Sequence, residues 1–363
     1  MLNEFSINLL TSEQNQLEKY CTYFKNVNKP IVLFGAGAIG LSYANYFKKQ
    51  KITNQLFFCD NNTDKQGMLI DGIPIISFME LKTMIQNSYI IITSFQYYDA
   101  IFNQLKENNL LDNLIDLPAH KLSLGYYNIV SKNIQKFKRT FTLLADDYSK
   151  RIFYERINFC ISLNSSYLTP LKSKSPQYFE SEIINLSEDE VFIDGGAYTG
   201  DTVEEFLRQT NGKYKKIYSF EPEEIKRYEF LKKFSSMKDI SFQPFGLWNK
   251  KDVLRFNAQG GLASKLSKNG EHKIPVTSID EFLSGEEASF IKMDIEGAEL
   301  EALIGARKTI RNFKPKLAIC VYHKPLDIVE IPLYIKQLVP EYKLFLRHYS
   351  NNLYDTILYA IPE

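Results

Sequence analysis

Acidic and glycine residues in the second half of the chain are spaced as in a nucleoside-binding site. Asp194 ends one predicted strand, Gly195 and Gly196 form the turn after it, and Glu221 follows the next predicted strand. Glycines let the backbone approach a ligand closely. Asp194 could pair with an ammonium group, and Glu221 could accept hydrogen bonds from both hydroxyls of a ribose. The alternative interpretation is a tight turn flanked by two exposed strand ends.

A second group of charged residues, Lys292, Asp294 and Glu296, lies where an apolar strand further along the chain ends. In an open α/β sheet the carboxyl ends of neighbouring strands converge on the ligand cleft, so we expect these side chains at or near the reacting centre. They could instead form a structural ion-pair cluster. For Glu299 we expect only a structural role at the start of the next helix, where a negative charge is favourable.

His323 follows the apolar strand at 317–321 and is predicted to emerge at the same edge as Asp294. A neutral imidazole there could remove a proton from a hydroxyl group as a general base. Asp294 is the alternative base, and His323 could simply be hydrogen-bonded at the edge of the cleft. Asp294 and Glu296 could also hold a divalent cation, but the sequence fixes no ligand set, so no metal site is predicted.

A glycine turn of the dinucleotide-binding type lies near the start of the chain, between a predicted strand at 30–34 and a predicted helix. Its three glycines follow the G-x-G-x-x-G spacing, and an aspartate lies 20 residues after the last of them, as expected for a ribose ligand. A helix start behind glycines is also an anion site. The candidate nucleotide-binding residues are Gly35, Gly37, Ala38, Ile39, Gly40, Asp60 and Asn61.

Strands and helices alternate around both glycine turns, which predicts an α/β protein with two doubly wound Rossmann-like domains. We expect a nucleotide- or nucleotide-sugar-binding domain at 1–120, a helical bridge and cap at 121–177, and a second domain at 178–363. Two apolar segments, 343–347 and 356–360, flank a polar turn and predict a terminal antiparallel hairpin.

Four segments of the second half, at 192–197, 220–222, 292–299 and 322–325, together resemble the FkbM family of S-adenosylmethionine (SAM)-dependent methyltransferases. The resemblance covers 178–363 and implies a class I methyltransferase fold, SAM as cofactor and methylation of a hydroxyl group. Such enzymes usually act on sugars or polyketides in surface-polysaccharide or antibiotic assembly. We therefore expect the cofactor at Asp194, Gly195, Gly196, Thr202, Glu221, Pro222, Gly246 and Leu247, the last two beside the adenine.

The segment after the first turn, at 60–75, is similar to the small front domain of sugar acetyltransferases that binds a nucleotide sugar. The combined prediction is an O-methyltransferase for a sugar or nucleotide-linked glycan precursor, with a second nucleotide ligand in the front domain. The alternatives are an NAD-dependent oxidoreductase and a non-enzymatic nucleotide-sensing or scaffolding module. For the front domain alone, the alternative is a degenerate Rossmann domain that serves docking or oligomerisation.

The composition sets limits on partners and location. With 363 residues and a net charge of +1, nothing favours nucleic acid as a partner, and a homo-oligomer is compatible with the sequence. Four widely spaced cysteines predict neither disulfides nor a zinc site. No signal peptide and no apolar run of about 20 residues is recognisable, so we expect a cytoplasmic protein without a membrane span.

Overall fold

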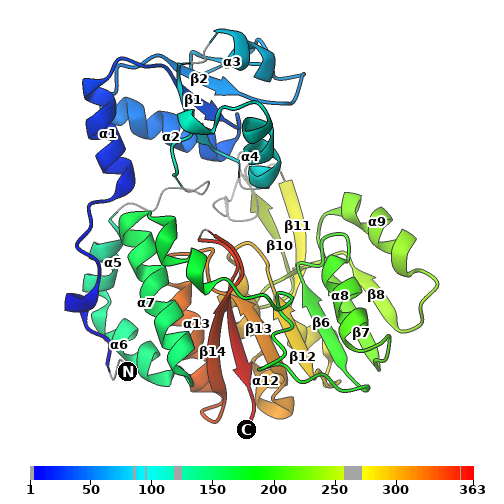
Figure 1. Ribbon diagram of the computed structural model, residues 1–363. Helices are drawn as coiled ribbons and strands as arrows, with labels where there is room; N and C mark the ends of the chain where they lie inside the picture. The colour runs from blue at the N-terminus through cyan, green and yellow to red at the C-terminus, as the bar shows by residue number, and fades with distance from the viewer. Residues whose placement is uncertain (1–3, 85–86, 95, 118–124, 257–271, 352) are drawn as a thin grey trace.

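The computed structural model describes residues 4–84, 87–94, 96–117, 125–256, 272–351 and 353–363. These residues form two separate sheets, each built mainly of parallel strands, and a third sheet of three short strands (Figure 1). The predicted fold class is confirmed. The predicted domain boundary at residue 120 lies outside the described residues.

The front sheet has the strand order β3-β4-β2-β1-β5, in which only β3 is antiparallel to its neighbour. Its central strand β1 is apolar and buried along its whole length, as parallel strands covered on both faces are. Helix α1 packs on one face together with α2, while α3 and α4 cover the other. The elements are β1 (Ile31–Phe34), β2 (Leu56–Cys59), β3 (Leu69–Ile70), β4 (Ile73–Ile76), β5 (Tyr89–Ile92), α1 (Gln16–Asn26), α2 (Ala38–Lys49), α3 (Phe78–Met84) and α4 (Tyr98–Glu107).

Three helices that follow the front sheet and precede the rear sheet in the sequence pack on the rear half. Helix α7 lies beside β14, and α6 lies beside α13 (Figure 1). The three helices are α5 (Tyr126–Lys132), α6 (Ile134–Leu143) and α7 (Asp147–Ser162). The start of the chain packs here as well, because the buried ring of Phe5 lies 5.7 Å from that of Phe153 and 4.9 Å from that of Tyr154. Arg347 of β14 forms a 2.9 Å ion pair with Asp146 at the start of α7. Phe5 is therefore part of the hydrophobic core of the rear half.

The rear sheet has the order β14-β15-β13-β12-β6-β7-β8, with five parallel strands followed by the antiparallel hairpin β14–β15. This is the layout that the class I methyltransferase fold implies. Helices α10–α13 cover one face and α8 and α9 the other. The strands are β6 (Val191–Gly195), β7 (Lys216–Phe220), β8 (Ile240–Gln243), β12 (Phe290–Met293), β13 (Lys316–Cys320), β14 (Lys343–His348) and β15 (Thr356–Ile361). The helices are α8 (Asp201–Gln209), α9 (Glu224–Phe234), α10 (Ile279–Leu283), α11 (Glu299–Gly305), α12 (Arg307–Phe313) and α13 (Asp327–Leu338).

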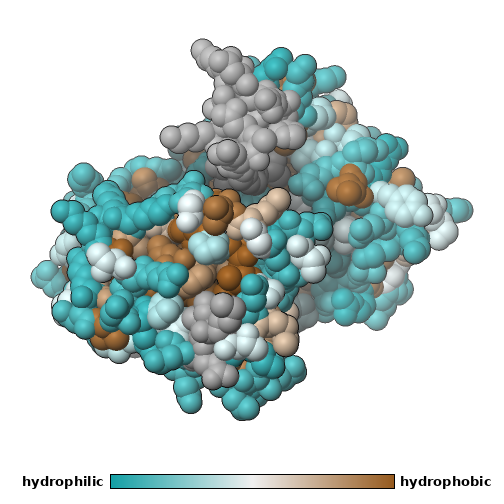
Figure 2. Space-filling model, turned by 90° about the horizontal axis from the view of Figure 1, so that it is seen from above, coloured by the Kyte–Doolittle hydropathy of each residue, from teal (hydrophilic) through white to brown (hydrophobic). Residues whose placement is uncertain are grey.

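The third sheet lies beside the carboxyl end of the rear sheet and pairs β10 with β11 and β11 with β9. It is formed by β9 (Gly246–Leu247), β10 (Asp252–Phe256) and β11 (His272–Thr277), and single 3-10 turns occur at Ile7–Leu9, Leu111–Asn113, Ser165–Tyr167 and Thr169–Leu171. Seen from above, the surface is mostly hydrophilic, with hydrophobic side chains gathered near the centre of the part nearest the viewer (Figure 2). Within the described ranges no helix has the length and apolar character needed to cross a membrane.

Candidate active site

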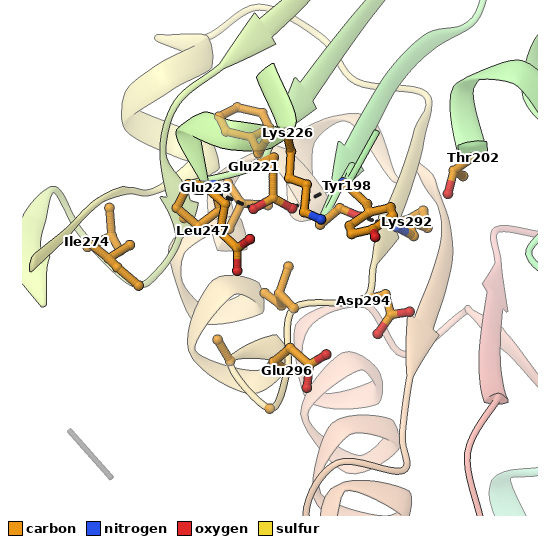
Figure 3. Close-up of a pocket in the computed structure, with 18 of the residues that line it drawn as sticks. Tyr198, Thr202, Glu221, Glu223, Lys226, Leu247, Ile274, Lys292, Asp294 and Glu296 are labelled. Atoms are coloured by element: carbon orange, nitrogen blue, oxygen red, sulfur yellow. Dashed lines mark hydrogen bonds between the residues drawn. The ribbon is translucent and has the colours of Figure 1, made fainter. Parts of the chain in front are cut away.

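A cavity of about 720 Å³ opens at the carboxyl ends of β6, β7 and β12 and is also lined by residues of the third sheet (Figure 3). Most of the residues predicted for the second half line it, which places the two acidic segments of the sequence around one cavity. The lining includes Gly196, Thr202, Glu221, Pro222, Gly246, Leu247, Lys292, Asp294 and Glu296. The predicted residues Asp194, Gly195 and His323 lie behind the wall rather than in it.

The two glycines at the end of β6, Gly195 and Gly196, are required by the packing of the protein itself. Gly196 has a φ of +76°, and a Cβ atom there would lie 1.9 Å from the backbone oxygen of Asp294. A Cβ atom on Gly195 would lie 2.8 Å from a methyl group of Leu247. Contact with the end of β12 is thus a reason for glycine at this turn that the sequence did not reveal, and close approach to a ligand stays a prediction.

Asp194 and Lys292 form a buried ion pair with 3.0 Å between Oδ1 and Nζ. The Lys292 ammonium also donates to the backbone oxygens of Gly195 and Gly196, at 3.2 and 2.9 Å. Burial acts to lower the pKa of Lys292, but the carboxylates of Asp194 and Asp294 raise it above its ordinary value. Lys292 therefore stays charged and fixes the glycine turn. Asp194 does not line the cavity itself but orients this lysine, which does.

Glu221 presents its carboxylate to the cavity in a fixed orientation (Figure 3). Its Oε2 accepts a hydrogen bond from the backbone N–H of Tyr198 at 3.1 Å, and its Oε1 accepts one from that of Glu223 at 3.0 Å. Burial raises the pKa of this carboxyl group. Each oxygen has a second lone pair beyond these backbone bonds, so Glu221 can accept two hydroxyl groups of one ligand.

An apolar wall stands next to Glu221. Leu247 from β9, Ile274 and Val276 from β11, and Pro222 after β7 all line this part of the cavity. Such a wall can bury the face of a flat ring. Thr202, in the first turn of α8, is buried and lines the cavity on the side away from Glu221 (Figure 3).

Asp294 lies beyond the glycine turn and is held by two tyrosines. Tyr178 donates a hydrogen bond to Oδ2 at 2.7 Å, and Tyr322 donates one to Oδ1 at 3.0 Å. Burial acts to raise the pKa of Asp294, but Lys292, His323 and these hydroxyls lower it below its ordinary value. Asp294 is therefore a carboxylate of weak basicity, which disfavours it as a general base. Sequence reasoning missed both tyrosine contacts, since no motif spacing connects Tyr178 with Asp294.

His323 is surrounded by three carboxylates. Its Nδ1 lies 2.9 Å from Glu299 Oε1, and its Nε2 lies 3.4 Å from Asp294 Oδ1 and 3.8 Å from Glu296 Oε2. Burial lowers its pKa, but the carboxylates raise it to about 9. The expected neutral imidazole does not fit this environment, because the ring is protonated at neutral pH. The expected structural role of Glu299 agrees with its position, since its Oε1 accepts from the backbone N–H of Ile295 at 2.9 Å.

Asp355 is a cavity-lining acid that the sequence did not single out. It precedes β15, has a φ of +63°, and accepts a 3.3 Å hydrogen bond from Gln177. Burial and the neighbouring charge of Asp294 raise its pKa to about 6. The sequence did contain a signal for this residue. Asp355 lies in the turn of the predicted hairpin, and that turn is beside the carboxyl end of β13.

In the front sheet, Asp60 forms a hydrogen bond with the backbone of the glycine turn. Asp60 Oδ2 accepts from the backbone N–H of Ala36 at 3.0 Å and pairs with Lys65 at 3.0 Å. Burial acts to raise the pKa of Asp60, but these contacts and the Asn62 N–H lower it. The carboxylate is therefore already engaged at the position expected for a ribose ligand.

The other predicted residues of the front turn have mixed surroundings. A Cβ atom on Gly40 would lie 2.3 Å from the Gly35 oxygen, so both glycines are close-packed, while the space around Gly37 is open. Ala38 and Ile39 begin α2, and Asn61 donates to the side chain of Gln104 at 2.8 Å. In addition, Gln96 from the loop after β5 reaches the rear cavity and lines it.

Comparison with known proteins adds family matches to both halves. Residues 194–350 match the family model "Methyltransferase FkbM domain", and residues 27–115 match "C2185-like, N-terminal". No curated protein matches the chain. Over residues 194–350 the chain is therefore similar to the methyltransferase domain of the FkbM family.

Solved structures show where the fold recurs. A methyltransferase FkbM from Methylobacillus flagellatus KT has 24% identity and a TM-score of 0.68, covering 96% of this chain and 94% of its own. An rRNA methylase from Streptococcus thermophilus has 16% identity and a TM-score of 0.34, over 49% of this chain and 89% of its own. The first similarity extends over both halves of the chain and shows that their combined fold occurs in another protein. The second similarity is weak.

Proposed function

We propose that the protein is a SAM-dependent O-methyltransferase, because residues 194–350 match the FkbM methyltransferase domain. Its acceptor would be a hydroxyl group of a sugar or nucleotide-linked glycan precursor of the kind used in surface polysaccharides. The observation that carries the cofactor assignment is Glu221, whose two oxygens are held by backbone N–H groups beside an apolar wall. A ribose and an adjoining flat ring match this pair of features.

In this proposal the adenine packs on the wall around Gly246 and Leu247, and the ribose hydroxyls donate to Glu221. The amino-acid end lies toward Gly196 and Thr202, where Lys292 and Asp194 hold the turn in place. SAM supplies an electrophilic methyl group. The acceptor hydroxyl then lies on the side of the cavity lined by Asp294 and Glu296.

The hydroxyl proton must leave as the oxygen–methyl bond forms and the carbon–sulfur bond breaks. His323 is not suited to accept it, since the imidazole is already protonated. Asp355 lines the same part of the cavity and has a carboxyl group whose pKa of about 6 is near the working range of a general base. We therefore assign the proton to Asp355, with Asp294 orienting the acceptor.

Calorimetry of the whole protein with SAM tests the cofactor assignment. We expect one SAM molecule per chain, and we expect S-adenosylhomocysteine to compete for the same site. NAD is the matched comparison, because it shares the adenosine part but not the amino-acid end. Absence of SAM binding, or tighter binding of NAD at the rear cavity, would contradict the proposal.

We further propose that the front glycine turn binds the nucleotide part of the acceptor. Open space at Gly37, in front of the first turn of the 12-residue helix α2, supports this, as does the reach of Gln96 into the rear cavity. Thermal shifts with UDP-, GDP- and CDP-sugars and with NAD are the test, and Gly37→Asp should abolish the shift by repelling phosphate. Stabilisation by NAD alone would favour the oxidoreductase alternative, and no stabilisation at all would favour a docking role.

A further inference from the structure

We propose that Asp294, Glu296 and His323 bind a divalent first-row metal ion such as Mn²⁺ at the acceptor end of the cavity. The three side chains come from the end of β12 and the end of β13, and they converge around His323 Nε2. Asp294, Glu299 and His323 also form a group whose potential ligand atoms all lie within 4.8 Å of one another.

The distances suit a shared ion. Two ligands that each lie about 2.1–2.2 Å from one metal are about 3.0–3.6 Å apart at octahedral or tetrahedral angles. The separation between His323 Nε2 and Asp294 Oδ1 is 3.4 Å, within that range. Glu296 Oε2 is 3.8 Å away on a side chain that is 56% exposed, so a small rotation brings it into range. Asp294 Oδ1 accepts one bond from Tyr322 and keeps a second lone pair.

The imidazole is oriented as metal-binding histidines are. Its Nδ1 faces Glu299, while its Nε2 faces Asp294 and Glu296. A metal ion at Nε2 takes the place of the proton that the ring carries in the ion-free protein, so metal binding releases one proton. Metal-ligating histidines typically direct their second nitrogen at a carboxylate, which fixes the ring and its tautomer. Glu299 Oε1 also accepts from the N–H groups of Ile295 and Gly297, at 2.9 and 3.3 Å. Glu299 is thus a positioning residue that holds both the histidine and the turn carrying Glu296.

A second observation points to an additional ligand in this cluster. Glu299 Oε2 is buried, on a side chain only 1% exposed, and has no hydrogen-bond partner among the described residues. Buried carboxylate oxygens are normally hydrogen-bonded, paired or bound to a metal. Lys292 is committed to Asp194 and to two backbone oxygens, so the His323 imidazolium is the cation that lies against these carboxylates in the ion-free protein. The cluster therefore gathers three carboxylates around one imidazole.

A metal here would have a direct use, and this role rests on the proposed function. A hydroxyl group bound to a divalent cation loses its proton more readily. The ion would hold the acceptor oxygen at the cavity wall formed by Asp294 and Glu296. Metal binding itself does not depend on the identity of the acceptor, nor on whether SAM binds.

Calorimetry and electron paramagnetic resonance of the EDTA-treated full chain with Mn²⁺ test the site. We expect one Mn²⁺ per chain, bound more tightly than Mg²⁺ because imidazole favours first-row metals. Glu299→Gln should weaken Mn²⁺ about 10–100-fold, as loss of such a partner does elsewhere. Glu296→Gln and His323→Ala should weaken it at least as much. Asp201→Asn, which removes an exposed cavity-lining carboxylate away from the cluster, is the control and should bind Mn²⁺ normally.

Two results would overturn the metal site. One is the absence of Mn²⁺ binding by the folded wild-type protein. The other is binding that Glu296→Gln leaves unchanged, which would show an adventitious site elsewhere; this exposed position keeps the test valid even if His323→Ala fails to fold. Mn²⁺ binding without SAM binding would contradict the proposed function alone, and SAM binding without Mn²⁺ would contradict the metal site alone.

Discussion

Replacement of Glu221 by Gln is the sharpest test of how the cavity binds SAM. In the wild-type protein both carboxylate oxygens accept backbone N–H groups, at 3.1 and 3.0 Å, and both are needed as acceptors. An amide can present only one oxygen. Its NH₂ group must face either the Tyr198 or the Glu223 N–H, so Glu221→Gln disturbs the ligand contact and the geometry that holds it.

The magnitude follows from the hydrogen bonds that the amide cannot accept. A hydrogen bond to a charged group contributes about 1.5–3 kcal/mol, and the apolar wall is untouched by the change. We therefore expect SAM affinity to fall about 10–100-fold, since about 1.4 kcal/mol corresponds to a factor of ten. Burial raises the pKa of Glu221, and protonation removes the same acceptor. Wild-type affinity should consequently fall as the pH is lowered toward that pKa, and the variant should lack this dependence.

Isothermal calorimetry with SAM at several pH values measures both effects. Glu224→Gln is the matched control, because Glu224 lies three residues further on, is exposed and forms a 2.8 Å ion pair with Arg227. The affinity of this control variant for SAM should equal that of the wild type. If Glu221→Gln binds SAM as tightly as the wild type, Glu221 is not the ribose ligand and the orientation proposed for SAM is wrong.

Three stability predictions follow from the packing, each measured by chemical or thermal unfolding. Gly196→Ala should destabilise the protein by about 1–3 kcal/mol through overpacking in addition to backbone strain, whereas Gly212→Ala, with a φ of +74° and open space, should show the strain alone. Glu190, just before β6, is buried and forms an ion pair with Lys316 of β13, so Glu190→Gln should destabilise the protein at neutral pH. Burial acts to raise the pKa of Glu190, but Lys316 lowers it below its ordinary value, so the difference from wild type should vanish as the pH falls through that lowered value. Phe5→Ala should cost about 3–5 kcal/mol, and Leu9→Ala, which is 56% exposed, almost nothing. Equal effects within either pair, or a pH-independent effect at Glu190, would contradict these accounts.

Much of the fold could be predicted because local patterns dictate it. Fully apolar strands such as 31–34 and 191–193 must be buried on both faces, and glycine turns between strand and helix mark parallel α/β units. The terminal hairpin followed from two apolar segments around a polar turn. Glu221 could be placed at the cavity because the ends of parallel strands meet at one edge.

The chemistry of the site depended on contacts that only the tertiary structure creates. The sequence indicated that Asp294 and His323 would emerge side by side, but three carboxylates of the segment 294–299, packed around a histidine that follows β13, decide that the imidazole is charged. Likewise, Asp194 is buried in an ion pair with Lys292 and does not line the cavity, whereas Asp355 of the last hairpin does. Residue type and spacing fix which strand end a side chain occupies. The protonation and partners of that side chain depend on burial and on charges distant in sequence, which become neighbours only when the sheet is assembled.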